Sequence, residues 1–272
     1  MDVATSKSGL RALKVAFALL VVFLYAPIVI LLIFSFNSGS TPAFPLTGFT
    51  IHWYTDFFAN AELTGALRTS AEVAALSSAV TVPLGVLASI VLVRRRFVGK
   101  ALVSSLLLSP LVIPYLVLGI SLLILFQALN VPLSIATVVI GHVVLSLPYT
   151  ILVLVPRLER IDESLEDAAR DLGASGLRTF RSITLPLTLP AIVSAFVIAF
   201  TLSFDEFAVA SFLIGREVTF PIYLFSQLRF PNLLPQVIAV AVIMFSASLL
   251  LILAAEVGRR IAERRLGTRV GS

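Results

Sequence analysis

Six long runs without Asp, Glu, Lys or Arg divide this sequence, and they constrain its fold more than any other feature. A helix needs about 20 apolar residues to cross the hydrocarbon core of a bilayer, which is about 30 Å thick. A transmembrane β-barrel would instead show short segments of alternating hydrophobicity. The runs are continuously apolar, so the sequence predicts an all-α integral membrane protein with six transmembrane helices. The predicted spans are residues 15–36, 73–93, 101–129, 131–156, 182–204 and 235–255.

The composition excludes a soluble globular domain. Of the 272 residues, 58% are hydrophobic and 13% are charged, whereas soluble domains carry about 25% charged residues. The absence of cysteine excludes disulfides, iron–sulfur clusters and thiolate metal sites. The two histidines, His52 and His142, are far apart in the sequence and form no metal-ligand pattern.

The basic residues predict an orientation in the membrane. All but three of the 20 Lys and Arg residues lie on one side of a six-span arrangement, the exceptions being Arg68, Arg216 and Arg229. By the positive-inside rule, both termini are expected in the cytoplasm. This divides the chain into a cytoplasmic N-terminal segment (1–14), a six-helix transmembrane domain (15–258) and a basic cytoplasmic tail (259–272). The net charge of +5 then reflects topology and contact with anionic membrane lipid, not binding of nucleic acid.

A short amphipathic helix is predicted between the fourth and fifth spans, at about residues 162–173. Asp162 is the expected N-cap, and Gly173 is expected to end the helix. A surface helix that binds anionic lipid usually has large apolar residues and a basic polar face. This segment has an acidic start and a small apolar face, which favours docking into a groove of a protein. The apolar face has the i, i+3, i+4, i+7 spacing of a helix and consists of Leu165, Ala168, Ala169 and Leu172.

The same segment resembles the EAA signature of ABC-importer permeases. That signature reads Glu-Ala-Ala, three residues, Gly, nine residues, Ile, one residue, Leu-Pro. Every spacing is matched here, with one departure: Asp167 replaces the Glu, and Glu166 stands immediately before it. Residues 109–114 are similar to the third span of such permeases. The Ser-Phe-Asp-Glu-Phe stretch at 203–207 resembles the polyamine branch of the family, the PotC-type spermidine/putrescine permeases. The signature positions are Asp167, Ala168, Ala169, Gly173, Ile183, Leu185 and Pro186.

The resemblance implies a type I ABC importer permease fold in a bacterial inner membrane, with the predicted helix acting as a cytoplasmic coupling helix. The implied partners are two copies of a cytoplasmic ATP-binding subunit, a second homologous permease and an external substrate-binding protein. The residues that would couple to the ATPase are Glu166, Asp167, Ala168, Ala169, Gly173, Ile183, Leu185 and Pro186.

The chain has no phosphate-binding loop of its own. The sequence Gly99-Lys100 is followed by Ala and lacks the earlier glycine of a Walker A motif. We therefore expect no enzymatic activity and no cofactor in this chain, with ATP and Mg²⁺ bound by the partner ATPase. The expected function is a permease subunit of an ATP-driven importer for polyamines or related small cationic amines. An opine, an amino acid or another small amine is the alternative substrate, and a channel or a non-transporting membrane scaffold is the alternative from another class.

Two adjacent carboxylates, Asp205 and Glu206, interrupt an otherwise apolar stretch. An Asp at the centre of a membrane helix costs roughly 3 kcal/mol on insertion scales, so such residues usually have a function. One interpretation is that both residues lie at the outer interface or pair with Arg216, Arg229 or Arg68. The other places at least one carboxylate in the substrate pathway, where it attracts the ammonium groups of an amine. Because neighbouring residues on a helix point about 100° apart, one should face the pathway and the other a helix contact or the outer gate.

His142 and the prolines inside the spans each have two interpretations. His142 either forms a hydrogen bond across helices or lines the pathway. The prolines either bend the bundle into shape or act as hinges; they are Pro83, Pro110, Pro114, Pro148 and Pro190.

Overall fold

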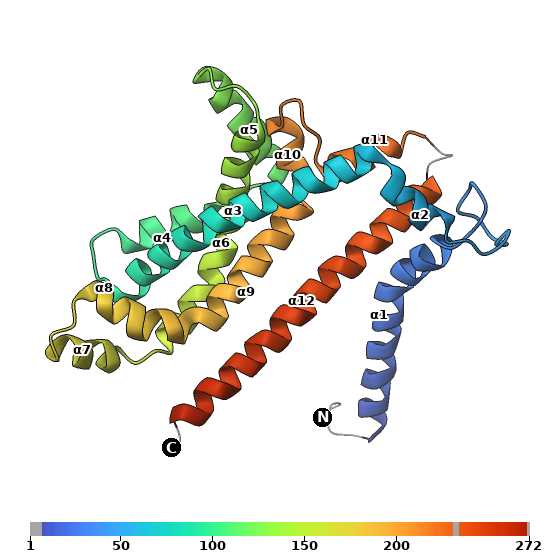
Figure 1. Cartoon of the computed structure of the whole chain (residues 1–272). Coiled ribbons are helices and arrows are strands. Elements are labelled where there is room, and N and C mark those ends of the chain that lie inside the picture. Colours follow the sequence, from blue (N-terminus) through green and yellow to red (C-terminus); the bar gives the residue numbers. More distant parts are fainter. Residues whose placement is uncertain (1–6, 231–233, 271–272) are drawn as a thin grey trace. The chain divides into compact units, whose positions relative to one another are not determined.

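The computed structural model describes residues 7–230 and 234–270 (Figure 1). The chain forms two compact units. The first unit comprises Met1–Ala61 and Leu224–Ser246, and the second comprises Glu62–Tyr223 and Ala247–Ser272. Within the described residues all regular secondary structure is helical, apart from one isolated bridge between Asn37 and Phe49, and loops connect the helices. The boundaries 1–14, 15–258 and 259–272 stay a prediction, and their outermost residues, 1–6 and 271–272, lie outside the described part.

Five described helical segments are long and apolar enough to cross a membrane, and a bent helix pair makes a sixth. This confirms the all-α membrane fold. The continuous segments are α1 (Lys7–Phe34), α3 (Ala61–Arg94), α6 (Ile135–Glu159), the run Gly176–Phe204 and α12 (Leu234–Val270). The run Gly176–Phe204 consists of α8 (Gly176–Thr179), a π-helical turn (Phe180–Thr184) and α9 (Leu185–Phe204).

The predicted span at 101–129 is sharply bent near Pro110 and Pro114, two of the prolines expected to bend the bundle or act as hinges. This region is a pair of helical pieces, Lys100–Leu111 and Tyr115–Ala128, that meet at 106°. The first piece contains α4 (Lys100–Leu108) and a 3₁₀ turn, and the second is α5 (Tyr115–Ala128). Pro114 stands at the N-cap of α5 with an extended backbone. Proline has no N–H to donate and disfavours helical geometry in the residue before it, so the helix breaks there.

Three other prolines stay inside continuous helices. Pro83 lies within α3, Pro148 within α6 and Pro190 within α9. Proline in a transmembrane helix is tolerated where neighbouring groups satisfy the freed backbone carbonyl.

The second span begins earlier than its apolar run. Helix α3 starts at Ala61, so Glu62 and Arg68 are helical although they precede the predicted span at 73–93. A search for charge-free runs stops at the first charge, but Glu and Arg are good helix formers. The reversal predicted at Asn130 is confirmed, because this residue has a left-handed φ of 55°. Helix α6 then begins with a capping box between Ser134 and Thr137.

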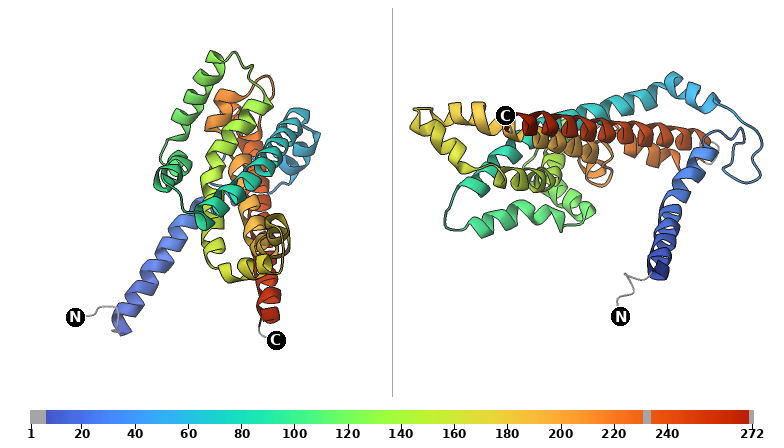
Figure 2. Two further views of the ribbon diagram at one scale, coloured as in Figure 1. Left: turned by 90° about the vertical axis from the view of Figure 1, so that its left-hand side faces the viewer. Right: turned by 90° about the horizontal axis from the view of Figure 1, so that it is seen from below.

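The core of the second unit has two apolar clusters: the larger is formed by α3, α5, α6 and α10 (Ala208–Leu213), and the smaller by α3, α6 and α9. Helices α6 and α9 lie side by side in Figures 1 and 2. Small buried residues of α9, Ala191, Ala195 and Ala199, allow a close approach, which is typical of helix pairs in membranes. Gly85 of α3 faces Thr150 of α6 so closely that an added Cβ would overlap the Thr150 side chain.

We expect Gly85→Leu to lower the stability of the folded chain by about 1–3 kcal/mol, the usual cost of overpacking a filled interface. The measurement is the midpoint of thermal unfolding in detergent. Gly65→Leu in the same helix is the matched control, because no atom lies within 4 Å of an added Cβ at Gly65. Equal midpoints for the two variants would contradict this packing.

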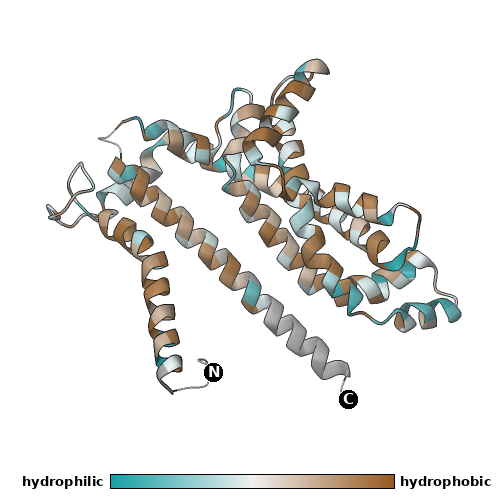
Figure 3. Ribbon diagram, turned by 180° about the vertical axis from the view of Figure 1, so that it is seen from behind, coloured by the Kyte–Doolittle hydropathy of each residue, from teal (hydrophilic) through white to brown (hydrophobic). Residues whose placement is uncertain are grey.

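Charged residues of the second unit are concentrated around α7 (Glu163–Asp171). In Figure 3, hydrophilic colour covers α7, whereas the spans are mostly hydrophobic. Both views in Figure 2 place α7 and α8 together, beside the beginning of α9. A short helix is thus held at the ends of the long ones.

Candidate functional site

Helix α7 has the ends that its sequence predicted. The Asp162 carboxylate accepts a hydrogen bond from the Ser164 N–H at 2.9 Å. This bond to the ionised form lowers the pKa of Asp162, so the cap is charged at neutral pH. Gly173 follows the helix with a φ of 81°, a conformation that costs little only for glycine.

The apolar face of α7 is open. Leu165 is 48% exposed and Leu172 is 89% exposed, although both are large apolar side chains. Leu177 in the neighbouring α8 is 60% exposed. An exposed apolar patch on a short helix is a surface that a protein partner can cover.

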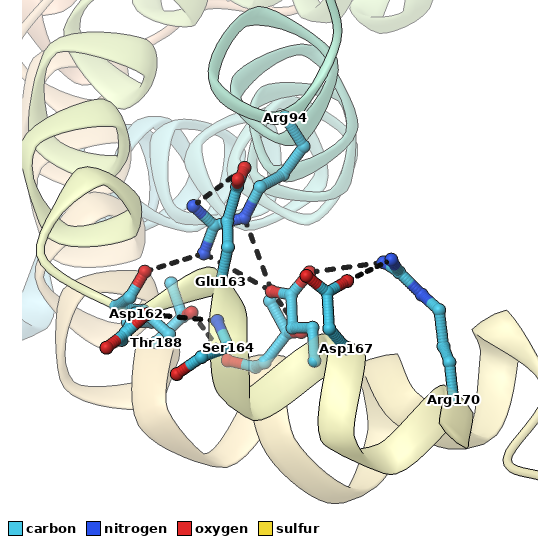
Figure 4. Close-up of polar contacts among 10 residues, drawn as sticks. Arg94, Asp162, Glu163, Ser164, Asp167, Arg170 and Thr188 are labelled. Carbon is cyan, nitrogen blue, oxygen red and sulfur yellow. Dashed lines mark hydrogen bonds and ion pairs between the residues drawn. The ribbon is translucent and has the colours of Figure 1, made fainter.

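The opposite face of α7 carries a buried charge, Glu166, which is only 6% exposed. Arg94, the last residue of α3, approaches its carboxylate with Nη2 at 3.3 Å from Oε1 and Nε at 3.4 Å. The Thr184 hydroxyl donates to the same oxygen at 3.0 Å. Arg94 also donates to the Ile161 carbonyl at 3.0 Å. Figure 4 shows Arg94 above α7, with Glu163 beside it.

Asp167, by contrast, is exposed and pairs with Arg170 at 2.8 Å along the helix surface (Figure 4). The signature position and the residue before it therefore differ in environment: Asp167 faces out and Glu166 faces in. Both line a polar cavity of about 450 Å³ that also contains Arg94, Arg95 and Thr184. The later signature residues are placed where the run Gly176–Phe204 passes into α9: Ile183 and Leu185 are half-buried, and Pro186 is exposed.

Asp205 and Glu206 lie in a break between two helices, not on a helix as expected. Helix α9 ends at Phe204, and the short α10 (Ala208–Leu213) begins after the break. The two residues differ in environment: Asp205 is exposed and Glu206 is buried. Glu206 accepts hydrogen bonds from the N–H groups of Val209 and Ala210, each at 2.8 Å. The carboxylate therefore caps the N-terminus of α10.

The interpretation in which Glu206 pairs with an outer arginine was wrong. Its partner is His142, whose Nε2 lies 3.3 Å from Oε2, in the geometry of an ion pair and not of an aligned hydrogen bond. Within the described residues of the second unit, neither Asp205 nor Glu206 forms an ion pair with Arg68 or Arg216.

The cross-helix interpretation of His142 is confirmed. Its Nδ1 lies 2.7 Å from the Ser203 hydroxyl of α9, and Ser77 of α3 donates to Ser203 at 2.8 Å. His142 is 1% exposed, so it does not line an open pathway in this conformation. Buried polar groups of this kind link helices when all of them are bonded. Among the described residues, no group of three or more His, Asp or Glu is placed to hold a metal ion.

Sequence reasoning missed two participants, Arg94 and Thr184. Arg94 was used only as one of the basic charges that orient the chain, and Thr184 lies between two signature positions. A signal was available for Arg94. It is the first charged residue after the second span, and the predicted orientation places it on the same side of the membrane as the acidic start of the predicted helix.

Comparison with known proteins decides the family. Residues 81–267 match the family described as the inner membrane component of binding-protein-dependent transport systems. The chain belongs to this family. It is a multi-pass inner-membrane permease of the ABC importer type, as the EAA resemblance predicted.

Relatives of the permease cover most of its length. It is 34% identical over 235 residues to the spermidine/putrescine transport system permease protein PotC of Escherichia coli K12, which covers 86% of this chain and 88% of the relative. It is 36% identical over 233 residues to the putrescine transport system permease protein PotI of the same strain, covering 83% and 82%.

Solved structures share the fold of the permease. A bacterial ABC transporter that imports the acidic polysaccharide alginate has a TM-score of 0.72 at 16% identity, covering 92% of this chain and 94% of that chain. The MetNI methionine ABC transporter, in inward-facing conformations, has a TM-score of 0.57 at 16% identity, covering 74% and 94%.

Proposed function

We propose that this permease moves polyamines or related small cationic amines across the bacterial inner membrane. An external binding protein delivers the substrate, and separate cytoplasmic subunits hydrolyse the ATP. The observation that carries the proposal is the identity of 34% and 36% to polyamine permeases across more than four-fifths of the chain. An opine or amino acid substrate is the alternative within the same class of importer.

The proposed partners follow from the family and from the open face of α7. They are two ATP-binding subunits that hold ATP and Mg²⁺, a second homologous permease and the external binding protein. In this proposal α7 is the coupling helix and both termini are cytoplasmic, as the basic residues predict. The exposed Leu165 and Leu172 support docking of α7 in a groove of the ATPase.

The proposed coupling residues have two roles. Asp167, Ala168 and Ala169 belong to the docking helix, Gly173 ends it, and Glu166 lies on its inner face. Ile183, Leu185 and Pro186 lead from the docking region into α9 and its membrane span. This supports a direct mechanical connection from the ATPase to the fifth span.

The proposed substrate contact is Asp205 and not Glu206. The Glu206 carboxylate is already occupied by His142 and two backbone N–H groups. Asp205 is exposed and therefore free to meet an ammonium group. A weak charge contact suits transport, because a substrate must leave each site as readily as it enters.

The proposed substrate class is tested by uptake into proteoliposomes that contain the whole transporter. The binding protein and the substrate are added outside, and ATP is enclosed inside. Radiolabelled putrescine is offered in the presence of an excess of spermidine, an opine or an amino acid. We expect only the polyamine to compete. Competition by the opine or amino acid, with no effect of spermidine, would contradict the proposed polyamine substrate and favour the alternative substrate. It would not contradict the proposal that the protein is an ABC importer permease.

Asp205→Asn is expected to raise the KM for putrescine uptake up to about 5-fold, since an exposed charge contact is worth at most about 1 kcal/mol. Binding of putrescine to the isolated external protein should be unchanged, because the defect lies after capture. Glu217→Gln, at another exposed carboxylate, is the control. An unchanged KM in Asp205→Asn would remove this residue from the pathway.

A further inference from the structure

The inner face of α7 holds a junction between three parts of the second unit, centred on the Glu166 carboxylate. Arg94 comes from the end of α3, and Thr184 comes from the turn that begins α9. Arg94 also holds the Ile161 carbonyl, between α6 and α7. One buried carboxylate therefore connects the docking helix to the ends of two membrane helices that are far apart in the sequence.

The junction is shielded from solvent. The side chains of Arg94 and Glu166 are 11% and 8% exposed, whereas Glu163, which also approaches Arg94, is 62% exposed. Removing one partner of a buried ion pair leaves an uncompensated charge, so such pairs resist separation. Exposed pairs contribute little, because water and salt screen them.

The hydrogen bonds of the junction continue into α9. Thr184 uses its hydroxyl for Glu166, and its backbone carbonyl accepts a hydrogen bond from the Thr188 hydroxyl at 2.6 Å. Arg157, near the end of α6, donates to the Leu187 carbonyl from Nη2 at 2.7 Å and from Nε at 2.9 Å. The first turn of α9 is thus fixed from two directions.

The two faces of α7 have separate tasks. Leu165, Asp167 and Leu172 are exposed, so they are available to a partner. Glu166 is turned away from that surface, and besides Arg94 its carboxylate lies 3.6 Å from Nη2 of Arg170, which also pairs with Asp167. A movement of the outer face is passed to the membrane helices through the contacts of the inner face. The strongest polar contacts of the inner face are those of Glu166 with Arg94 and Thr184.

From this geometry, and resting on the proposed function of α7, we propose that Glu166 is a positioning residue that clamps α7 to α3 and α9. With the clamp closed, α7 and the ends of both helices move as one body when the ATPase closes. With the clamp broken, α7 still docks on the ATPase, but its movement is no longer passed to the membrane helices.

The test uses the assembled transporter in proteoliposomes and the variants Glu166→Gln and Arg94→Gln. We expect the ATPase subunits to copurify as in the wild type and basal ATP hydrolysis to stay within about twofold. Putrescine moved per ATP hydrolysed should fall at least tenfold in each variant. The double variant should be no worse than either single one, because both remove the same contact. Glu163→Gln, on the same helix and near the same arginine but exposed, is the matched control and should behave as wild type.

A distance measurement separates a clamp from a merely structural role. The chain has no cysteine, so spin labels can be placed at Ser164→Cys on α7 and Ser182→Cys before α9, with partner subunits freed of their own cysteines. In the wild type the distance between the labels should be the same with and without ATP. In Glu166→Gln it should change with ATP.

Each result decides between the two proposals. A distance that changes with ATP in the wild type, or normal transport per ATP in Glu166→Gln, overturns the clamp but not the proposed function. Loss of ATPase copurification in Glu166→Gln also overturns it, because Glu166 would then serve docking. Absence of ATP-driven uptake by the wild type overturns the proposed function, and the clamp with it.

Discussion

Leu172→Asp is expected to abolish ATP-driven uptake and to release the ATPase subunits from the purified complex. Leu172 is 89% exposed in the chain alone, so the substitution should leave the fold intact. In the proposed complex this side chain is buried in a groove of the ATPase. A buried charge without a partner at the centre of an interface costs at least about 2 kcal/mol, which weakens association roughly 30-fold or more.

The measurement is copurification of the ATPase subunits together with uptake at equal amounts of permease in the membrane. Leu172→Met is the matched control, because it keeps an apolar side chain of similar volume and should retain both activities. Normal copurification of the ATPase with Leu172→Asp would show that this face of α7 is not the docking surface.

Glu206→Ala is expected to have the largest effect on stability of any single change discussed. The substitution removes the acceptor for two buried backbone N–H groups, those of Val209 and Ala210, and leaves His142 without its carboxylate. Each buried donor left without an acceptor costs about 1–3 kcal/mol. We therefore expect a clear drop in the thermal midpoint in detergent and little uptake.

Two comparisons make this expectation specific. Glu206→Gln keeps one acceptor oxygen and should be intermediate in thermal stability. Asp205→Ala, at the exposed neighbour, should keep the wild-type midpoint while it impairs uptake. If Asp205→Ala lowered the midpoint as much as Glu206→Ala, the assignment of a structural role to Glu206 and a pathway role to Asp205 would be wrong.

The local features of α7 could be predicted because they depend on neighbouring residues. An acidic N-cap at Asp162 and a left-handed Gly173 determine the ends of the helix within a few residues. The same holds for the reversal at Asn130. The six apolar runs were long enough to reveal the membrane fold, since only a helix satisfies its backbone within such a run.

The contacts that connect distant segments could not be predicted. Arg94 and Glu166 are 72 positions apart, and nothing local to either residue selects the other. The sequence has two adjacent carboxylates at 166–167, and the EAA signature of the family selects the second, Asp167. Which of the two is buried depends on how α7 rotates against α3 and α9, and packing determines that rotation.

The size of the bend at 109–114 could not be predicted for a different reason. Pro110 and Pro114 indicated a bend. The amino-acid composition of the run does not reveal the angle of that bend, which is 106°. In the same way, Asp205 and Glu206 were placed on a continuing helix because the apolar stretch continues beyond them. The backbone instead leaves the helix after Phe204, and Glu206 turns back to cap α10.

ATP-driven accumulation of a polyamine separates a permease subunit from a channel or a scaffold. Proteoliposomes should be prepared with this chain alone, and with this chain together with its ATPase, second permease and binding protein. We expect labelled putrescine to accumulate above its external concentration only with all subunits and ATP, and the chain alone to pass neither putrescine nor ions. Conductance of the chain alone, or equilibration of putrescine without ATP, would contradict a coupled permease and indicate a channel.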